Sequence, residues 1–255
     1  MIVRAVLERR ILVNYRVDPD VLAAVVPAPF RPVVTGGYGV AGICLIRLGR
    51  IRPSGLPAIA PISSESAAHR IAVEWDSTTG PVRGVYIPRR DTSSRLTVLA
   101  GGRVFPGRHH LARFEVSEGG GRYRVRMVSA DGRARICVGA CLAGQAMPGS
   151  VLGGLDQAAQ FFRRSPIGYS ATPVPSVYDG VAFGCSGWDF RPLLVDELES
   201  SFFDDAGRFP TGTAALDSAF LMCGLDTTWQ PLPKLRATAS SGPGPGRPEA
   251  SAAVG

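Results

Sequence analysis

A cluster of arginine and hydroxyl side chains follows an apolar stretch in the first half of the chain. Residues 87–95 read IPRRDTSSR and include Arg89, Arg90, Ser94 and Arg95. A guanidinium group is planar and donates paired hydrogen bonds to a carboxylate or phosphate, and hydroxyl groups can hold an oxyanion. The pattern predicts an anion-binding segment in which these four residues bind substrate. The alternative is a solvated loop with an internal Arg–Asp pair.

Groups that can transfer protons lie on both sides of this segment. Glu74 stands between an apolar stretch and a tryptophan, and a carboxylate that faces a closed cavity has a raised pKa suited to general acid–base catalysis. We therefore expect Glu74 or Glu65 to shuttle protons, with Tyr86 or His109 assisting. An equally acceptable interpretation is that Glu74 neutralises a buried arginine.

Metal and nucleic-acid sites are not expected. His109 and His110 are adjacent, so on a strand they point to opposite faces, and no Cys, His or Asp cluster at ligand spacing accompanies them. One of the two could still line a cavity as a proton donor. The arginines between 122 and 135 form a basic stripe without the aromatic residues that stack on bases. We expect a small-molecule partner, no nucleic acid, no metal and no cofactor.

Alternating side chains predict the strands that position these residues. Residues 69–76 alternate, and a turn at Gly80-Pro81 leads to a partner strand over 82–87. A second hairpin turns at Asp131-Gly132. Its inward positions are Tyr123, Val125, Met127, Ala134, Ile136 and Val138.

Helix signals are few. Asp18 followed by Pro19 predicts a capped helix over 21–26, and residues 156–163 predict a second short helix. Many strands with few helices favour an α+β fold that is mostly antiparallel, with a closed or strongly curved sheet. We expect residues 1–234 to form one domain and residues 235–255, rich in Gly, Pro, Ser and Ala, to form a disordered tail.

Composition limits the class of protein. The chain has 255 residues, 45% of them hydrophobic, and its net charge of +7 favours anionic partners. The five cysteines are odd in number and scattered, which argues against a disulfide framework. No apolar run approaches the roughly 20 residues that a membrane span needs. We expect a cytoplasmic protein without a membrane partner, and a homo-oligomer stays open.

Several motifs in order carry a family resemblance over about Ile2 to Trp229. They are NYRVDPDVLAAVVPAPFRP, GVAGICLIRL, SSESAAHRIAVEWD, GVYIPRRDTSSRL and AGGRVFPGRHHLARF, extended by SSFFDD. The chain resembles the uncharacterised YqjF-like branch of the acetoacetate decarboxylase-like superfamily. The resemblance implies a cone-like or barrel-like antiparallel sheet with an internal cavity and a few flanking helices. Ser66 and Thr228 depart from the branch, where Asn and His are usual.

The resemblance also bears on the chemistry. The decarboxylases use a lysine pair after a proline, one lysine forming a Schiff base, and the segment similar to it here is Pro88-Arg89-Arg90. Arginine stays protonated and cannot be that nucleophile, and the only lysine, Lys234, borders the tail. We therefore expect an enzyme of lyase or isomerase type that does not depend on lysine. Its substrate would be an anionic oxo acid or polyketide-like molecule, and its reaction a decarboxylation without an imine, a dehydration or a cyclisation.

The rival hypothesis is a non-catalytic protein that binds or carries a metabolite in the same cavity. Proton transfer needs a carboxylate or histidine within about 3 Å of the ligand. A carrier needs only the arginine anchors. The side chains on the cavity wall therefore discriminate between the two functions.

Overall fold

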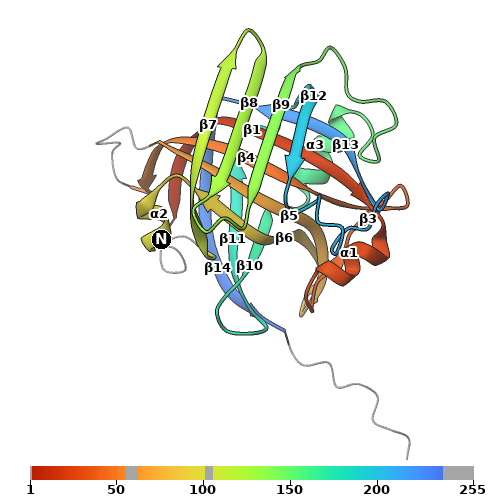
Figure 1. Cartoon of the computed structure of the whole chain (residues 1–255). Coiled ribbons are helices and arrows are strands. Elements are labelled where there is room, and N and C mark those ends of the chain that lie inside the picture. Colours follow the sequence, from red (N-terminus) through yellow and green to blue (C-terminus); the bar gives the residue numbers. More distant parts are fainter. Residues whose placement is uncertain (1, 56–62, 101–105, 238–255) are drawn as a thin grey trace, which may run out of the picture.

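Long strands dominate the computed structural model, which describes residues 2–55, 63–100 and 106–237 (Figure 1). Three short helices accompany the strands in this part of the chain: α1 (Pro19–Val25), α2 (Arg95–Ala100) and α3 (Leu155–Arg163). The strands are β1 (Val3–Val17), β2 (Arg31–Pro32), β3 (Val34–Thr35), β4 (Tyr38–Pro53), β5 (Ser64–Ser77), β6 (Gly80–Thr92), β7 (His109–Gly119), β8 (Arg122–Ser129), β9 (Arg135–Leu142), β10 (Ile167–Ala171), β11 (Val177–Cys185), β12 (Arg191–Ser200), β13 (Ala214–Met222) and β14 (Leu225–Arg236).

The sheet closes on itself in two rings that share one wall. Strands β1, β4, β5 and β6 form this shared wall. Strands β10, β11 and β14 connect β6 back to β1 and close what we call the seven-stranded ring. Strands β7, β8, β9, β12 and β13 connect the same two strands by another route and close the nine-stranded ring. The prediction of a mostly antiparallel, closed sheet with few helices is confirmed.

Both faces of the shared wall are buried, because successive side chains on a strand point to opposite faces. Ile43 and Leu45 belong to one hydrophobic core together with residues of β8 and β9. Their neighbours Cys44 and Ile46 belong to a second core, which includes residues of α3. The seven-stranded ring thus encloses one face of the wall, and β7, β8, β9 and β12 cover the other.

Local sequence signals explain the helices and hairpins that were predicted. The Asp18 side chain accepts hydrogen bonds from the backbone amides of Asp20 (2.9 Å) and Val21 (3.2 Å), which caps α1 behind Pro19. The turn between β8 and β9 contains Gly132 at φ +70°, a conformation that glycine adopts without strain. Helix α3 lies where the second helix was expected. Helix α2 was not predicted.

The basic stripe on β8 faces acidic residues of β12. Arg122 pairs with Asp196 at 2.5 Å, and Arg124 and Arg126 pair with Glu197 at 2.7 and 3.1 Å. These carboxylates offset part of the positive charge that the sequence displays on this strand.

A β-bulge interrupts the pairing of β5 with β6. Ile71 is opposite Tyr86 and His69 is opposite Arg89, so β6 contains one more residue than β5 between these pairs. Such a bulge shifts the inward–outward alternation of all later residues by one position. Pro88, which cannot donate a ladder hydrogen bond, lies inside it.

The C-terminal boundary differs slightly from the expectation. Strand β14 continues to Arg236, and the amide of Ala237 still donates to the carbonyl of Ser176 at 2.9 Å. Residues 238–255 of the expected tail lie outside the described residues, and the single-domain assignment stays a prediction. Among the helices that the structure describes, none is long and apolar enough to cross a membrane.

A buried histidine inside the nine-stranded ring predicts acid sensitivity. His69 is 1% exposed and stacks on Phe202, and burial followed by the charge of Arg89 lowers its pKa from 6.5 to about 3. Below pH 6.5 the imidazole of His69 therefore binds a proton in the unfolded chain but stays unprotonated in the folded chain. Stability should fall as the pH drops from about 6.5 towards 3, by up to about 1.4 kcal/mol per pH unit for this group.

Urea unfolding of the wild type and of His69→Gln, measured between pH 7.5 and 4.5, checks this prediction. The variant should show a shallower loss of unfolding free energy over that range. Some slope should persist, because the pKa values of His109 and His110 are also lowered. Equal slopes in both proteins would contradict the assignment of a buried neutral imidazole to His69.

Candidate functional site

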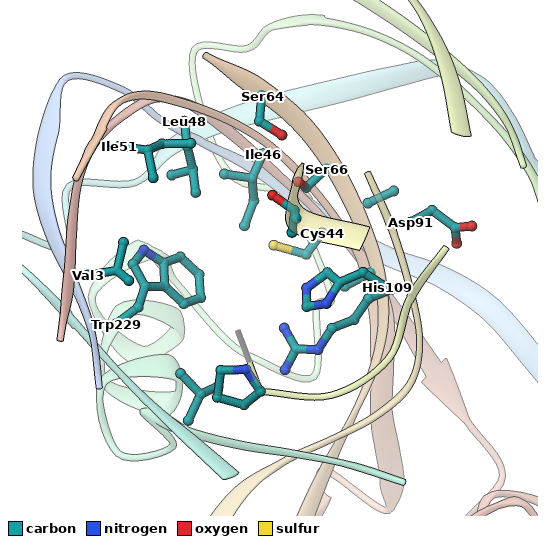
Figure 2. A pocket seen from close by; sticks show the side chains of 16 residues that line it. Val3, Cys44, Ile46, Leu48, Ile51, Ser64, Ser66, Asp91, His109 and Trp229 are labelled. Atoms are coloured by element: carbon teal, nitrogen blue, oxygen red, sulfur yellow. The ribbon is translucent and has the colours of Figure 1, made fainter. Parts of the chain in front are cut away.

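A cavity of about 100 Å³ lies inside the seven-stranded ring (Figure 2). Strands β4, β5, β6, β11 and β14 provide most of its wall, and α2 and the start of β7 complete it. Most lining side chains are apolar. The polar lining residues are Ser64, Ser66, Arg90, Asp91, Thr97, His109 and the indole of Trp229. One water-sized group needs roughly 10–15 Å³ of such space, so the cavity suits a small molecule.

Arg90 brings a buried positive charge to this cavity. Its Nε donates to Ser170 Oγ at 3.1 Å, and its Nη2 is buried without a hydrogen-bond partner. No carboxylate of the described residues pairs with it. Burial lowers the pKa of the guanidinium from 12.5 to about 10, so it still carries its charge at neutral pH. A buried cation without a counter-ion is costly, and an anionic ligand would compensate it.

His109 lies beside Arg90 because β7 runs parallel to β6 with these two residues in register. Its Nδ1 is 3.2 Å from the carbonyl oxygen of Gly107. A carbonyl only accepts hydrogen bonds, so Nδ1 carries the hydrogen in this contact and Nε2 is the acceptor. Burial, followed by the charge of Arg90, lowers the imidazole pKa from 6.5 to about 3. His109 is therefore neutral at physiological pH.

Arg89 and Asp91 point to the other face of the wall. Arg89 donates from Nε to Asp91 (2.9 Å) and from Nη2 to Asp131 (2.8 Å) and Ser129 (2.6 Å). The carboxyl of Asp91 is 1% exposed, and burial raises its pKa although Arg89 opposes the shift. In Figure 2 the Asp91 carboxyl group points away from the cavity. The Arg–Asp pair weighed as an alternative thus exists for Arg89.

Glu65 belongs to a buried ion-pair cluster on that same face. Its two carboxylate oxygens accept from Arg9 at 2.5 Å and from Arg47 at 2.6 Å. Both arginines also pair with Glu118 of β7. The cluster ties the shared wall to the outer strands, and the Glu65 carboxylate is not among the groups that line the cavity.

The other predicted site residues lie apart from the cavity. Glu74 pairs with Arg83 at 3.3 Å on a partly exposed surface. Tyr86 packs against Phe30 with ring centroids 5.5 Å apart, and burial raises its pKa. Ser94 accepts a hydrogen bond from the backbone amide of Thr97 at the start of α2 (3.2 Å), where Arg95 is exposed. Of the eight predicted site residues, the structure brings Arg90 and His109 together at the cavity.

Several cavity residues were not predicted to have a role. Cys44, Ser66 and Trp229 line the space, and Arg10 and Arg70 lie in an adjoining compartment. A usable signal was the two-residue spacing of Ser66, Ala68 and Arg70, which places all three on one face of β5. Nothing in the sequence pattern indicates that this face, arginine included, is buried.

Lys234 does not line this cavity, although it lines a neighbouring pocket together with Asp179 and His109. Its Nζ is 2.8 Å from Asp179 Oδ1, and its side chain is 53% exposed. Within residues 2–55, 63–100 and 106–237, no group of three or more His, Cys, Asp or Glu side chains is placed to hold a metal ion.

Comparisons with known proteins identify the fold. The DUF2071 family, described as an uncharacterized conserved protein, matches residues 4–164. Acetoacetate decarboxylase from Legionella pneumophila superposes with a TM-score of 0.61 at 12% identity, over 93% of this chain and 87% of that one. An acetoacetate decarboxylase-like enzyme from Sphingomonas wittichii RW1 gives a TM-score of 0.57 at 11% identity, over 92% and 91%.

A third similar structure is the enduracididine biosynthesis enzyme MppR complexed with pyruvate. Its TM-score is 0.54 at 14% identity, over 89% of this chain and 87% of that one. No curated protein matches the sequence significantly. At these identities the structural matches establish a shared fold, so the predicted resemblance to acetoacetate decarboxylase-like proteins is confirmed for the fold.

Proposed function

Since this chain belongs to the DUF2071 family and has an acetoacetate decarboxylase-like fold, we propose that it is a small-molecule enzyme of lyase or isomerase type. Its substrate would be a short anionic oxo acid bound in the cavity of the seven-stranded ring. The observation that carries this proposal is Arg90, a charged guanidinium with a buried, unpartnered Nη2 beside a neutral histidine. The pyruvate bound by MppR supports the same class of ligand.

The proposed mechanism couples binding to proton transfer. Burial is the main cause of the low pKa of His109, and the charge of Arg90 lowers it further. A substrate carboxylate next to Arg90 would offset this second effect. The pKa of His109 would rise, so Nε2 would be a stronger base with substrate bound than without it. His109 would then take a proton from the carbon next to the carbonyl, or return one to it. Decarboxylation without an imine, dehydration and cyclisation each use such a transfer at carbon.

Lysine chemistry is not part of the proposed mechanism. A Schiff base needs an unprotonated amine that faces the substrate. Lys234 is the only lysine, and it pairs with Asp179 with more than half of its side chain exposed. Arg90 would bind and polarise the substrate without forming a covalent bond to it.

A metabolite carrier is the second candidate, favoured by one observation. The carboxylates of Asp91, inside the predicted segment, and of Glu65, on the neighbouring strand, are both held in ion pairs with arginines. Neither carboxylate is therefore needed for proton transfer in a carrier. The two functions differ in whether His109 transfers a proton. Nucleic-acid binding is not part of either proposal.

Deuterium exchange at C3 of pyruvate, 2-oxobutyrate and oxaloacetate in D₂O, followed by ¹H NMR, tests the proposal. We expect the wild type to accelerate the exchange of at least one of these acids. His109→Gln should slow it by roughly 10²–10⁴-fold, the range for loss of a general base. Lys234→Arg is the control and should exchange at the wild-type rate.

Two results would count against the enzyme, and a third would count against its lysine-independent mechanism. Binding without any exchange would assign the carrier function, and no binding at all would overturn both candidates. Borohydride treatment with pyruvate should leave the protein mass unchanged. A mass increase that Lys234→Arg abolishes would restore lysine chemistry.

A further inference from the structure

The cavity has a second compartment of about 80 Å³ on the α3 side of the seven-stranded ring. Cys44, Arg90 and Trp229 line both compartments, so the two spaces adjoin. The second is lined in addition by two arginines, Arg10 of β1 and Arg70 of β5, and by aromatic side chains. Neither arginine has a part in the mechanism proposed above.

Arg10 has hydrogen-bonding capacity left inside this compartment. Its Nε donates to Cys44 Sγ at 3.2 Å, and its guanidinium carbon lies 4.9 Å from the centre of the Phe183 ring. Its Nη1 is buried without a partner. The aromatic ring and the thiol hold the guanidinium in place, but neither neutralises it as a carboxylate would.

Arg70 repeats this arrangement on the neighbouring side. It is 5% exposed, its Nη2 donates to Asn14 Oδ1, and its guanidinium carbon lies 4.5 Å from the centre of the Phe162 ring. Its Nε is buried and unpartnered. Burial lowers its pKa to about 10, and Arg70 and Arg10 line the same compartment.

The charge balance of the two compartments is uneven. Three arginines line them, each with one buried nitrogen that lacks a hydrogen-bond partner. The single lining carboxylate residue among the described residues is Asp91, whose side chain is held by Arg89 on the other face. A ligand with one carboxylate at Arg90 would leave Arg10 and Arg70 uncompensated in a compartment of low polarity.

We propose that the natural ligand is a short-chain dicarboxylic acid that occupies both compartments. One carboxylate lies against Arg90 beside His109, and the other accepts hydrogen bonds from Arg10 Nη1 and Arg70 Nε. The carbon chain passes between Cys44 and Trp229, which line both spaces. This inference rests on the proposed function for the first carboxylate, and it names the substrate class by adding the second.

Titration calorimetry with glutarate and valerate, two acids of equal chain length, tests the inference. We expect the wild type to bind glutarate roughly tenfold or more tightly than valerate, since charge-assisted hydrogen bonds from two arginines are gained. Arg10→Met and Arg70→Met should each lower glutarate affinity by about tenfold. The ratio of glutarate affinity to valerate affinity should then fall towards one. The wild-type comparison does not depend on the folding of any variant.

The outcomes separate this inference from the proposed function. Equal wild-type affinity for the two acids, or a ratio unchanged in both variants, would overturn the dicarboxylate and leave the oxo-acid site intact. Inorganic sulfate should bind at Arg10 and Arg70. If sulfate weakened the binding of glutarate but not that of valerate, the result would support two separable anion sites. If neither acid bound to the wild type, so that the wild type and Arg90→Met gave the same absence of a binding signal, the inference and the proposed function would both be overturned.

Discussion

Replacing Arg90 by methionine is expected to abolish anion binding and at the same time to stabilise the fold. Loss of a buried charged partner should weaken binding of short oxo acids by on the order of a hundredfold or more. The same change removes a buried cation that no described carboxylate compensates, so the free energy of unfolding should rise by about 1–2 kcal/mol. Calorimetry with pyruvate and urea unfolding of the same samples measure both effects.

Arg95→Met is the matched control for this prediction. Arg95 comes from the same arginine-rich segment, but it is exposed at the start of α2. Its replacement should change unfolding free energy by less than about 0.5 kcal/mol and leave pyruvate affinity as it was. If Arg90→Met destabilised the protein as well as abolishing binding, Arg90 would be a structural residue and not a ligand anchor that costs stability.

Replacing Glu65 by glutamine should give the opposite pattern, a large loss of stability with intact binding. Glu65 accepts from Arg9, whose side chain is 2% exposed, and from Arg47. Without Glu65, Arg9 and Arg47 would share the single carboxylate of Glu118, so their charges would be only partly compensated. The loss should therefore approach, without exceeding it, the value of about 3–5 kcal/mol that removing one partner of a buried ion pair typically costs. Urea unfolding checks the loss, and calorimetry on the folded fraction should return wild-type affinity for pyruvate.

Glu74→Gln provides the comparison for this second prediction. Glu74 also follows the acid–base pattern in the sequence, but its pair with Arg83 is partly exposed and should contribute only about 0–1 kcal/mol. A small effect at Glu65, similar to that at Glu74, would show that the ion-pair cluster does not stabilise the packing of the shared wall against β7. Loss of binding at Glu65 without loss of stability would return it to a role in catalysis.

Most of the fold could be predicted from local patterns in the sequence. Alternation predicted the strands β5, β8 and β9 and the buried face of β8 and β9, and Asp18-Pro19 predicted α1. These signals depend on neighbouring residues alone. The closure of two rings through one wall depends on pairings between distant strands, such as β1 with β14, and periodicity does not specify such pairings.

The β-bulge in β6 is the reason why the sequence predicted only part of the site. Alternation continued from Tyr86 and Ile87 would place Arg89 on the cavity face and Arg90 on the other. The extra residue at the β-bulge reverses this, so Arg90 faces the cavity and Arg89 pairs with Asp91. A bulge of one residue has no reliable sequence signal beyond a proline. Arg10 and Arg70 were missed because a buried, unpaired arginine looks in sequence like an exposed one.

Because β6 belongs to the shared wall, the number of its residues constrains the site as strongly as the identity of those residues. Turns at the ends of the wall can gain residues without moving any side chain inside a ring. One residue gained or lost between Gly80 and Arg89 would turn Arg90 to the other face and bring Arg89 and Asp91 to the cavity. The cavity would then hold an Arg–Asp pair in place of an unpaired cation. Natural divergence of this cavity should therefore proceed by substitution along fixed-length strands, and a designer who alters its specificity should keep the residue count of β6 unchanged.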